Sequence, residues 1–214
     1  MNTEKERRSW LVTGCSSGLG RALAEAVLAR GDCCAVTARR PETLASFAER
    51  CPGTALVLPL DVTSPESMDN AVRAALDRFG GLDVLVNNAG YCLRGAVEEC
   101  SDAEVRRQFE TNFFGTVGMI RRVLPAMRAA RSGAIVNFSS IAALSTSEGS
   151  AFYGASKLAV EGMSDGLRRE VGPLGIRVMV VEPGPFRTRF FEALDISAGD
   201  LADYRGTAGR RKVR

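Results

Sequence analysis

Short apolar runs separated by amphipathic stretches follow one another along most of the chain. Six of these runs are rich in strand-forming residues: SWLVT, CCAVTA, ALVLPLDV, LDVLVNN, GAIVNFSS and IRVMVVEP. The stretches between them carry helix signals. Strands that alternate with helices in this way predict βαβ units and a parallel sheet that is buried on both faces. We therefore expect an α/β fold with a single doubly wound parallel sheet and helices on both faces.

Local signals mark the points where several helices begin. Pro41 suits the first turn of a helix, and Ser64 followed by Pro65 is typical of an N-cap and first helical position. Ser101 and Glu104 have the spacing of a capping box.

The alternating pattern stops after Thr188. The segment FFEALDISAGDLADY contains helical fragments and glycines but no seventh apolar strand, and the chain ends in a basic run that we interpret as solvated. The sixth strand should therefore lie at an edge of the sheet, where its unpaired backbone groups tend to recruit a partner. The unpaired edge of this strand is therefore compatible with a homo-oligomer.

Composition narrows the possible partners. The 214 residues have a formal net charge of +3, which gives no reason to expect nucleic acid or an anionic membrane. The start of the chain lacks the apolar segment of a secretory signal, and no apolar run approaches the roughly 20 residues of a membrane span. The six cysteines form no C-x-x-C pair and histidine is absent. We expect reduced core thiols, no metal site and a cytoplasmic protein.

A glycine-rich turn follows the first apolar run. Gly14, Gly18 and Gly20 lie in the stretch TGCSSGLG, directly before the helical stretch RALAEAVLARG. Glycines at this point let backbone N–H groups approach a pyrophosphate at the positive end of the helix. A tight strand-to-helix turn that needs glycine only for its backbone angles is the alternative, and the turn alone leaves both open.

Polar or glycine-rich residues also follow the other predicted strands. Asp61 ends the third strand, the stretch NNAG at 87–90 ends the fourth, and positions 139–140 and 183–184 end the fifth and sixth. Ligands of a doubly wound sheet bind outside the carboxyl ends of its strands. These clusters therefore predict one shared site at that edge.

The stretch AFYGASKLAV carries candidate acid–base residues. Tyr153 and Lys157 stand four positions apart, and residues at this spacing are neighbours on one helix face. A free tyrosine has a pKa near 10, so bringing it to about 7 needs ~4 kcal/mol in favour of the phenolate. A lysine charge at ~4 Å supplies ~4 kcal/mol at an effective dielectric constant of 20. The pair can therefore act together in a chain without histidine.

The chain resembles the classical short-chain dehydrogenases/reductases and is similar to their hydroxysteroid and retinol dehydrogenase branch. The matching stretches are TGCSSGLG, LDVT, NNAG, TNFFG, IVNFSS, YGASK and PGPFRT, in the family's order from about residue 10 to 190. The resemblance implies a dinucleotide-binding, Rossmann-type domain over 1–190. Residues 191–214 form a short substrate-side segment and basic tail, which lacks the family's last strand and helix.

The resemblance also implies an enzyme that acts on CH–OH or C=O groups. Tyr153 is then the general acid–base, and Lys157 lowers its pKa and holds the nicotinamide ribose. Ser140 hydrogen-bonds the substrate oxygen, and Asn112 holds a water in the proton relay to Lys157. A strand-end turn residue is the alternative for Ser140, and a satisfied core amide is the alternative for Asn112.

The resemblance further implies the residues that surround the cofactor. Asp61 reaches the adenine, Asn88 the adenosine ribose and Thr188 the carboxamide. The complete expected set is Gly14, Ser16, Ser17, Gly18, Leu19, Gly20, Arg39, Asp61, Val62, Asn88, Ala89, Gly90, Tyr153, Lys157, Pro183, Gly184 and Thr188.

The residues after the second strand favour NADP(H) over NAD(H). An NAD enzyme typically has an acidic residue there, bonded to the ribose 2′-OH. Alignment with the family places Ala38 at this position, followed by Arg39 and Arg40. Both arginines precede Pro41, the start of a predicted helix, where cations are disfavoured. A 2′-phosphate would explain them because guanidinium groups bind phosphate well; a solvated surface pair is the alternative.

The substrate is indicated only in outline. Apolar residues flank the expected site and favour a hydrophobic alcohol or ketone, although they equally suit core packing: Tyr91, Leu93, Phe152, Phe186, Phe190 and Phe191. A catalytically silent NADPH-binding regulator or scaffold is the alternative function. Ser140, Tyr153 and Lys157 argue against it, and the short C-terminal region argues for it. We expect cofactor binding with weak turnover in a pocket that is open on one side.

Overall fold

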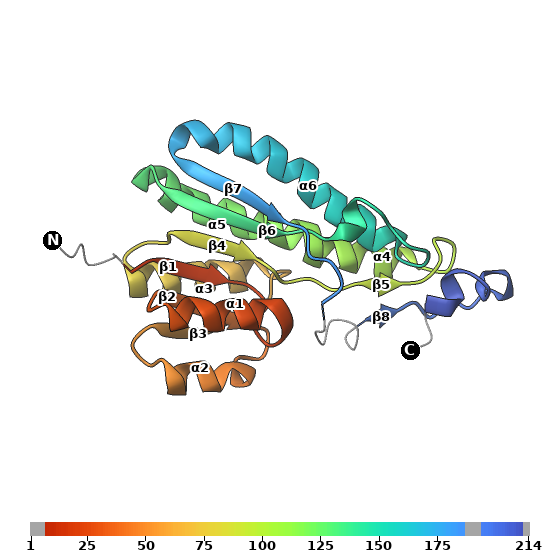
Figure 1. Cartoon of the computed structure of the whole chain (residues 1–214), viewed down its shortest axis with the longest axis horizontal. Coiled ribbons are helices and arrows are strands. Elements are labelled where there is room, and N and C mark those ends of the chain that lie inside the picture. Colours follow the sequence, from red (N-terminus) through yellow and green to blue (C-terminus); the bar gives the residue numbers. More distant parts are fainter. Residues whose placement is uncertain (1–6, 187–193, 212–214) are drawn as a thin grey trace.

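Figure 1 shows the main sheet, which has six strands, each parallel to its neighbours. The computed structural model describes residues 7–186 and 194–211. In chain order, the strands of the main sheet are β1 (Ser9–Val12), β2 (Cys33–Ala38), β3 (Ala55–Pro59), β4 (Val84–Asn87), β6 (Gly133–Phe138) and β7 (Ile176–Val181). Their spatial order is β3-β2-β1-β4-β6-β7, and all neighbouring pairs are parallel. The chain starts mid-sheet and winds outward in both directions, which confirms the predicted doubly wound α/β fold.

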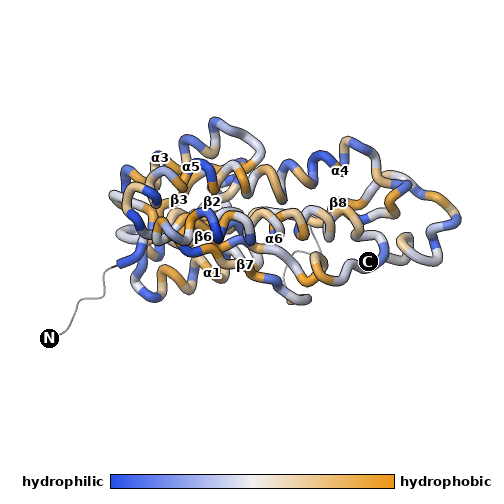
Figure 2. The backbone as a smooth tube through the Cα atoms, turned by 90° about the horizontal axis from the view of Figure 1, so that it is seen from above, coloured by the Kyte–Doolittle hydropathy of each residue, from blue (hydrophilic) through white to orange (hydrophobic). Residues whose placement is uncertain are grey.

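Helices lie on both faces of this sheet. The five that pack against it are α1 (Gly18–Ala29), α2 (Ala45–Arg50), α3 (Pro65–Phe79), α5 (Gly115–Ala130) and α6 (Ala151–Val171). One apolar cluster joins α1 and α2 to the sheet, and a second joins α3, α5 and α6 to its other face. Figure 2 shows the hydrophobic strands between α3 and α5 on one side and α1 on the other.

The alternation of side chains along the strands explains why both faces are covered. In β1, Leu11 packs in the cluster of α3, α5 and α6, while Val12 packs in the cluster of α1 and α2. Leu85 and Val86 of β4 divide in the same way. Successive residues of a strand point to opposite faces. Runs that are apolar at every position therefore predict helices on both sides, and this expectation is confirmed.

The predicted helix starts are also confirmed. Pro41 opens a short 3-10 helix at Pro41–Leu44 that leads into α2. The Ser64 hydroxyl accepts a hydrogen bond from the backbone N–H of Ser67 at the start of α3. Ser101 and Glu104 form a complete capping box at the start of α4 (Asp102–Phe109).

The C-terminal segment departs in one respect from the prediction. β7 lies at an edge of the main sheet, as expected. The following segment, however, contains a two-residue strand, β8 (Asp195–Ile196), which pairs in parallel with β5 (Leu93–Arg94) outside the main sheet. Two 3-10 turns follow, and the helix considered for this segment is absent from residues 194–211. A strand of two residues is too short to give a periodic signal.

Candidate active site

The glycine-rich turn between β1 and α1 needs glycine at three positions. Gly14 and Gly18 have φ values of +74° and +61°, in the left-handed region that favours glycine. Gly20 has another reason, because a Cβ there would collide with the side-chain amide of Asn88 and the carbonyl oxygen of Gly14. The turn is therefore a close-packed backbone loop at the carboxyl end of β1.

Asn88 and Thr13 hold this turn against the end of β4. The Asn88 amide nitrogen donates to the carbonyl oxygens of Thr13 (2.9 Å) and Gly14 (3.0 Å). The Thr13 hydroxyl accepts from the backbone N–H groups of Asn88 and Ala89, both at 2.9 Å. The Asn88 side chain thus positions the turn, and its contact with an adenosine ribose stays a prediction. The sequence reasoning did not single out Thr13.

The first turn of α1 offers unused donors beside the glycines. Ser17 is the N-cap residue, but its side chain makes no capping hydrogen bond, and the first turn contains no acidic residue. Backbone N–H groups in a first turn have no partner within their own helix. Ser16 is exposed, and Gly18 and Leu19 are half-buried. The turn and helix start therefore form a cradle that fits an anionic pyrophosphate.

The residues expected near the adenosine lie at the ends of β2 and β3. Ala38 is buried at the end of β2, and Arg39 and Arg40 after it are exposed. Neither arginine forms an ion pair within residues 7–186 and 194–211. Asp61 accepts from the backbone N–H (2.9 Å) and hydroxyl (2.7 Å) of Thr63. Ala38 thus stands where an NAD enzyme typically has an acid, and an exposed pair of arginines follows it.

Tyr153, Lys157 and Ser140 are brought together by α6 and the end of β6. Tyr153 and Lys157 are only 8% and 5% exposed. The Lys157 Nζ donates to the carbonyl oxygen of Phe138 at 2.8 Å and lies 5.9 Å from the centre of the Tyr153 ring. Ser140 shares a hydrogen bond with the Tyr153 phenol. The hydroxyl of Ser139 instead donates to the backbone of α6, at 3.4 Å from the Lys157 carbonyl oxygen.

Burial controls the ionisation of Tyr153 and Lys157. It raises the pKa of Tyr153 above its ordinary value of 10.0, while the hydrogen bond with Ser140 acts in the opposite direction. It lowers the pKa of Lys157 from 10.5 to about 8. The charge of Arg94 also acts to lower the pKa of Tyr153. The Lys157 ammonium group is hydrogen-bonded to the carbonyl oxygen of Phe138, and its expected effect on the phenol stays a prediction.

Asn112 links the segment after β4 to α6. It lies in a π-helical turn, Glu110–Phe114, between α4 and α5. Its Oδ1 accepts from the N–H of Tyr91 (3.1 Å), and its Nδ2 donates to the carbonyl oxygen of Tyr91 (3.0 Å) and the hydroxyl of Ser156 (3.1 Å). The side chain is a satisfied buried amide, which was the structural alternative. Its role in holding a water stays a prediction.

The remaining expected residues divide between the site and its surroundings. A Cβ on Gly90 would lie 2.9 Å from the Asn112 Oδ1 and 3.4 Å from the Lys157 Nζ, so Gly90 lies against these two candidate residues. The carbonyl oxygen of Pro183 accepts from the N–H of Ile141 at 3.2 Å, which places positions 183–184 beside the turn of Ser140.

The apolar residues expected to flank the site differ in exposure. Leu93 is buried in β5, Tyr91 and Phe152 are half-buried, and Phe186 is 55% exposed. Thr188, Phe190 and Phe191 lie outside the described residues. Leu93 therefore serves core packing.

Two residues of the stretch YCLRG were not singled out from the sequence but lie near Tyr153. The Arg94 Nη1 donates to the hydroxyl of Ser150 at 2.6 Å. The Cys92 thiol interacts with Arg94 and with Ser150, and burial raises the pKa of this thiol to about 11. The signal that could have identified Arg94 from the sequence is that it is a single charged residue inside an otherwise apolar run.

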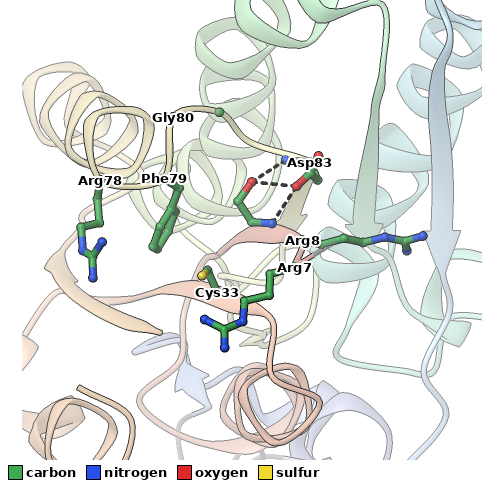
Figure 3. A pocket seen from close by; sticks show the side chains of 9 residues that line it. Arg7, Arg8, Cys33, Arg78, Phe79, Gly80 and Asp83 are labelled. Carbon is green, nitrogen blue, oxygen red and sulfur yellow. Dashed lines mark hydrogen bonds between the residues drawn. The ribbon is translucent and has the colours of Figure 1, made fainter. Parts of the chain in front are cut away.

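A large cavity at the opposite edge of the sheet is separate from this site (Figure 3). It has a volume of about 700 Å³ and includes Arg8, Cys33, Arg78 and Asp83 in its wall. The Asp83 carboxylate accepts from the backbone N–H (2.7 Å) and hydroxyl (2.9 Å) of Ser9. It thereby ties the start of β1 to the loop before β4. The candidate active site lies at the opposite, carboxyl ends of the strands.

Within residues 7–186 and 194–211, no helix is long and apolar enough to cross a membrane. The same residues contain no group of three or more metal-ligating side chains, and the six cysteines are free thiols.

The fold is a doubly wound α/β fold with a glycine-rich turn at the carboxyl end of β1. A family model described as short chain dehydrogenase matches residues 8–197. The chain therefore belongs to the short-chain dehydrogenase/reductase family.

Curated relatives agree with this assignment. The chain is 41% identical over 196 residues to a 3-ketodihydrosphingosine reductase from Bacteroides thetaiotaomicron, covering 91% of this chain and 70% of that protein. It is 44% identical over 190 residues to the oxidoreductase calM of Penicillium decumbens, covering 85% of this chain and 62% of that protein. The chain thus spans about two thirds of the length of these relatives.

Solved structures show the same fold. A short-chain dehydrogenase from Streptomyces avermitilis matches with a TM-score of 0.90 and 44% identity, covering 95% of this chain and 76% of that one. ElxO with NADP bound matches with a TM-score of 0.81 and 32% identity, covering 85% and 75%. A 3-ketoacyl-(acyl-carrier-protein) reductase from Brucella melitensis, complexed with NADH, matches with a TM-score of 0.84 and 28% identity, covering 87% and 79%.

Gly20→Ala should weaken cofactor binding roughly tenfold or more and destabilise the fold by about 1–3 kcal/mol. The added methyl group would push the Asn88 amide or the Gly14 carbonyl out of position. Fluorescence titration with NADPH and urea unfolding would measure the two effects. Gly162→Ala is the matched control, because a Cβ at this helical position meets nothing within 4 Å. Native affinity in Gly20→Ala would contradict the close packing of the turn.

Proposed function

We propose that this chain is an NADP(H)-dependent oxidoreductase that transfers a hydride between nicotinamide and a hydrophobic alcohol or ketone. The observation that carries the proposal is the enclosed group of Ser140, Tyr153 and Lys157 beside the glycine-rich cradle. The cofactor, when bound, supplies or accepts the hydride. The name of the 3-ketodihydrosphingosine reductase supports a ketone on an apolar molecule.

The residues of the cradle fit a dinucleotide. The turn at Gly14 and the uncapped start of α1 would hold the pyrophosphate through backbone N–H groups. Arg39 would bind the 2′-phosphate, and Lys157 would hold the nicotinamide ribose. The backbone N–H groups at the start of α1 have no partner within their own helix. Arg39 forms no ion pair among the described residues.

Tyr153 would exchange the proton at the substrate oxygen, with Ser140 as a second hydrogen-bond donor. Because burial raises its pKa, the phenol keeps its proton at neutral pH, which suits it to donate a proton to a carbonyl oxygen. Oxidation of an alcohol needs the phenolate, which the same burial disfavours. The protonated phenol is therefore the form that would serve carbonyl reduction.

A screen of aldehydes and ketones of increasing apolar size, followed by the absorbance of NADPH, would test this function. We expect turnover of at least one hydrophobic carbonyl compound. Tight NADPH binding without turnover of any compound would overturn the proposed reaction and support a silent regulator.

The free thiols of the six cysteines are compatible with a reducing compartment, and we propose a cytoplasmic location.

Arg39→Ala should reduce the preference for NADPH over NADH roughly tenfold, because a charge-assisted bond to the 2′-phosphate is lost. Binding of both cofactors to the native protein and the variant would be measured by titration. Arg40→Ala is the control, since this neighbouring arginine is equally exposed but carries no assigned contact. Equal affinities of the native protein for the two cofactors would remove the basis for this assignment.

A further inference from the structure

Arg94 is a half-buried cation near the proposed acid–base residue. It belongs to β5, and its Nη1 donates to the hydroxyl of Ser150 at 2.6 Å. Its Nε is fully enclosed and has no hydrogen-bond partner. Within the two segments that the structure describes, no carboxylate pairs with its guanidinium group.

The free edge of the guanidinium has a defined chemistry. Ser150 occupies Nη1 and the protein itself encloses Nε, so the edge that remains for a ligand is at Nη2, which donates to no oxygen of a described residue. A charge-assisted hydrogen bond from a guanidinium N–H is strong, and a carboxylate oxygen is an acceptor that matches it. Such a bond would also give the guanidinium the counter-charge that it lacks among the described residues.

Two contacts locate this edge relative to the chemistry. Ser150 immediately precedes α6, three positions before Tyr153. The charge of Arg94 also acts on the Tyr153 phenol, and the thiol of Cys92 lies close enough to interact with Arg94, Tyr153 and Lys157. A ligand group on Arg94 would therefore belong to the same molecule whose oxygen meets Tyr153.

We propose that Arg94 binds a carboxylate of the substrate, so that the enzyme acts on apolar oxo- or hydroxy-carboxylates. The inference rests on the proposed oxidoreductase function and narrows its substrate class. A purely structural arginine is the competing explanation, because the bond to Ser150 also ties β5 to the start of α6. The two explanations differ in one measurable respect: only substrate recognition distinguishes a carboxylate from its uncharged ester.

Isothermal titration calorimetry with the NADP⁺-loaded protein would test the proposal. The ligands are apolar oxo-carboxylates of increasing chain length, each compared with its methyl ester. In the native protein we expect at least one acid to bind roughly tenfold or more tightly than its ester. Arg94→Gln should abolish this ratio, and Arg94→Lys should keep part of it, because lysine keeps the charge but loses the planar guanidinium group. Arg73→Gln, at an exposed position of α3, should leave the ratio unchanged.

The native protein alone can overturn the proposal. If no acid binds more tightly than its ester, whether both bind alike or neither binds, Arg94 is not a carboxylate site. An unchanged ratio in Arg94→Gln would have the same meaning, provided that urea unfolding and NADPH affinity show an intact fold. The proposed function fails differently, through a lack of NADPH binding or of any carbonyl reduction. If the oxo group is reduced equally well in the oxo-carboxylates and in their methyl esters, only the role of Arg94 is removed.

Discussion

Tyr153→Phe should lower kcat/KM for carbonyl reduction by about a hundredfold to ten-thousandfold, the range that a general acid contributes. The substitution removes the proton donor but keeps the ring, which is almost fully enclosed. NADPH affinity should therefore stay close to that of the native protein. The fold should also persist, because the Ser140 hydroxyl keeps its hydrogen bond from the backbone N–H of Ala142 at 3.1 Å.

A matched control separates the loss of a proton donor from the loss of a hydroxyl group. Tyr204 donates its phenolic hydrogen to Glu98 at 2.8 Å in the C-terminal segment. Tyr204→Phe should keep turnover. Steady-state kinetics and NADPH titration of both variants would decide the matter. Near-native turnover in Tyr153→Phe would exclude the acid role, and a parallel loss of NADPH affinity would indicate a structural role instead.

The fold could be predicted because its signals are local. Each strand of the main sheet is a run of four to six residues in which both faces are largely apolar, as for CCAVTA at Cys33–Ala38. The capping box at Ser101 and the cap at Ser64 join residues only three positions apart. Such patterns can be read without knowledge of the tertiary structure. The pairing of β5 with β8 involves two residues on each side, and no local pattern signals it.

For the candidate site, the sequence predicted which residues come together but not how their side chains contact one another. Sequence motifs indicated which residues gather at the carboxyl edge of the sheet, but not what their side chains contact. The bonds from Asn88 to the glycine-rich turn span 74 and 75 positions, and the bond from Asn112 to Ser156 spans 44. Contacts at such separations depend on the packed sheet. The positioning bonds of Asn88 and Asn112 within the protein could therefore not be predicted in detail, and the ligand contacts that the resemblance implies for both residues stay predictions.

The spacing of Tyr153 and Lys157 illustrates the same limit. Residues four positions apart share a helix face, and the electrostatic argument placed the lysine charge ~4 Å from the phenol. In the structure, the ammonium group turns to the carbonyl oxygen of Phe138 instead. A helix fixes the direction in which a side chain leaves the backbone, whereas neighbouring elements decide where a long side chain ends.

Lys157→Met should abolish most activity and weaken NADPH binding, yet stabilise the folded chain at pH 7. Lys157 is almost completely enclosed, and burial lowers its pKa from 10.5 to about 8. A shift of this size corresponds to a destabilisation on the order of 3 kcal/mol when the lysine is charged. Methionine fills a similar volume without charge. The gain should be about 1–3 kcal/mol, because the variant also loses the hydrogen bond to Phe138.

The pH dependence gives this prediction its sharpest test. Below pH 8 the folded and unfolded chains both hold the Lys157 proton, so the native protein bears the full effect of the buried charge. Between about pH 8 and 10.5 the folded chain releases this proton first, and the free energy of unfolding of the native protein rises with pH. The advantage of Lys157→Met should therefore shrink across this window. Urea unfolding at several pH values would measure it, with exposed Leu158→Met as the control. A constant difference, or a less stable variant at pH 7, would show that the lysine is not buried as a charge.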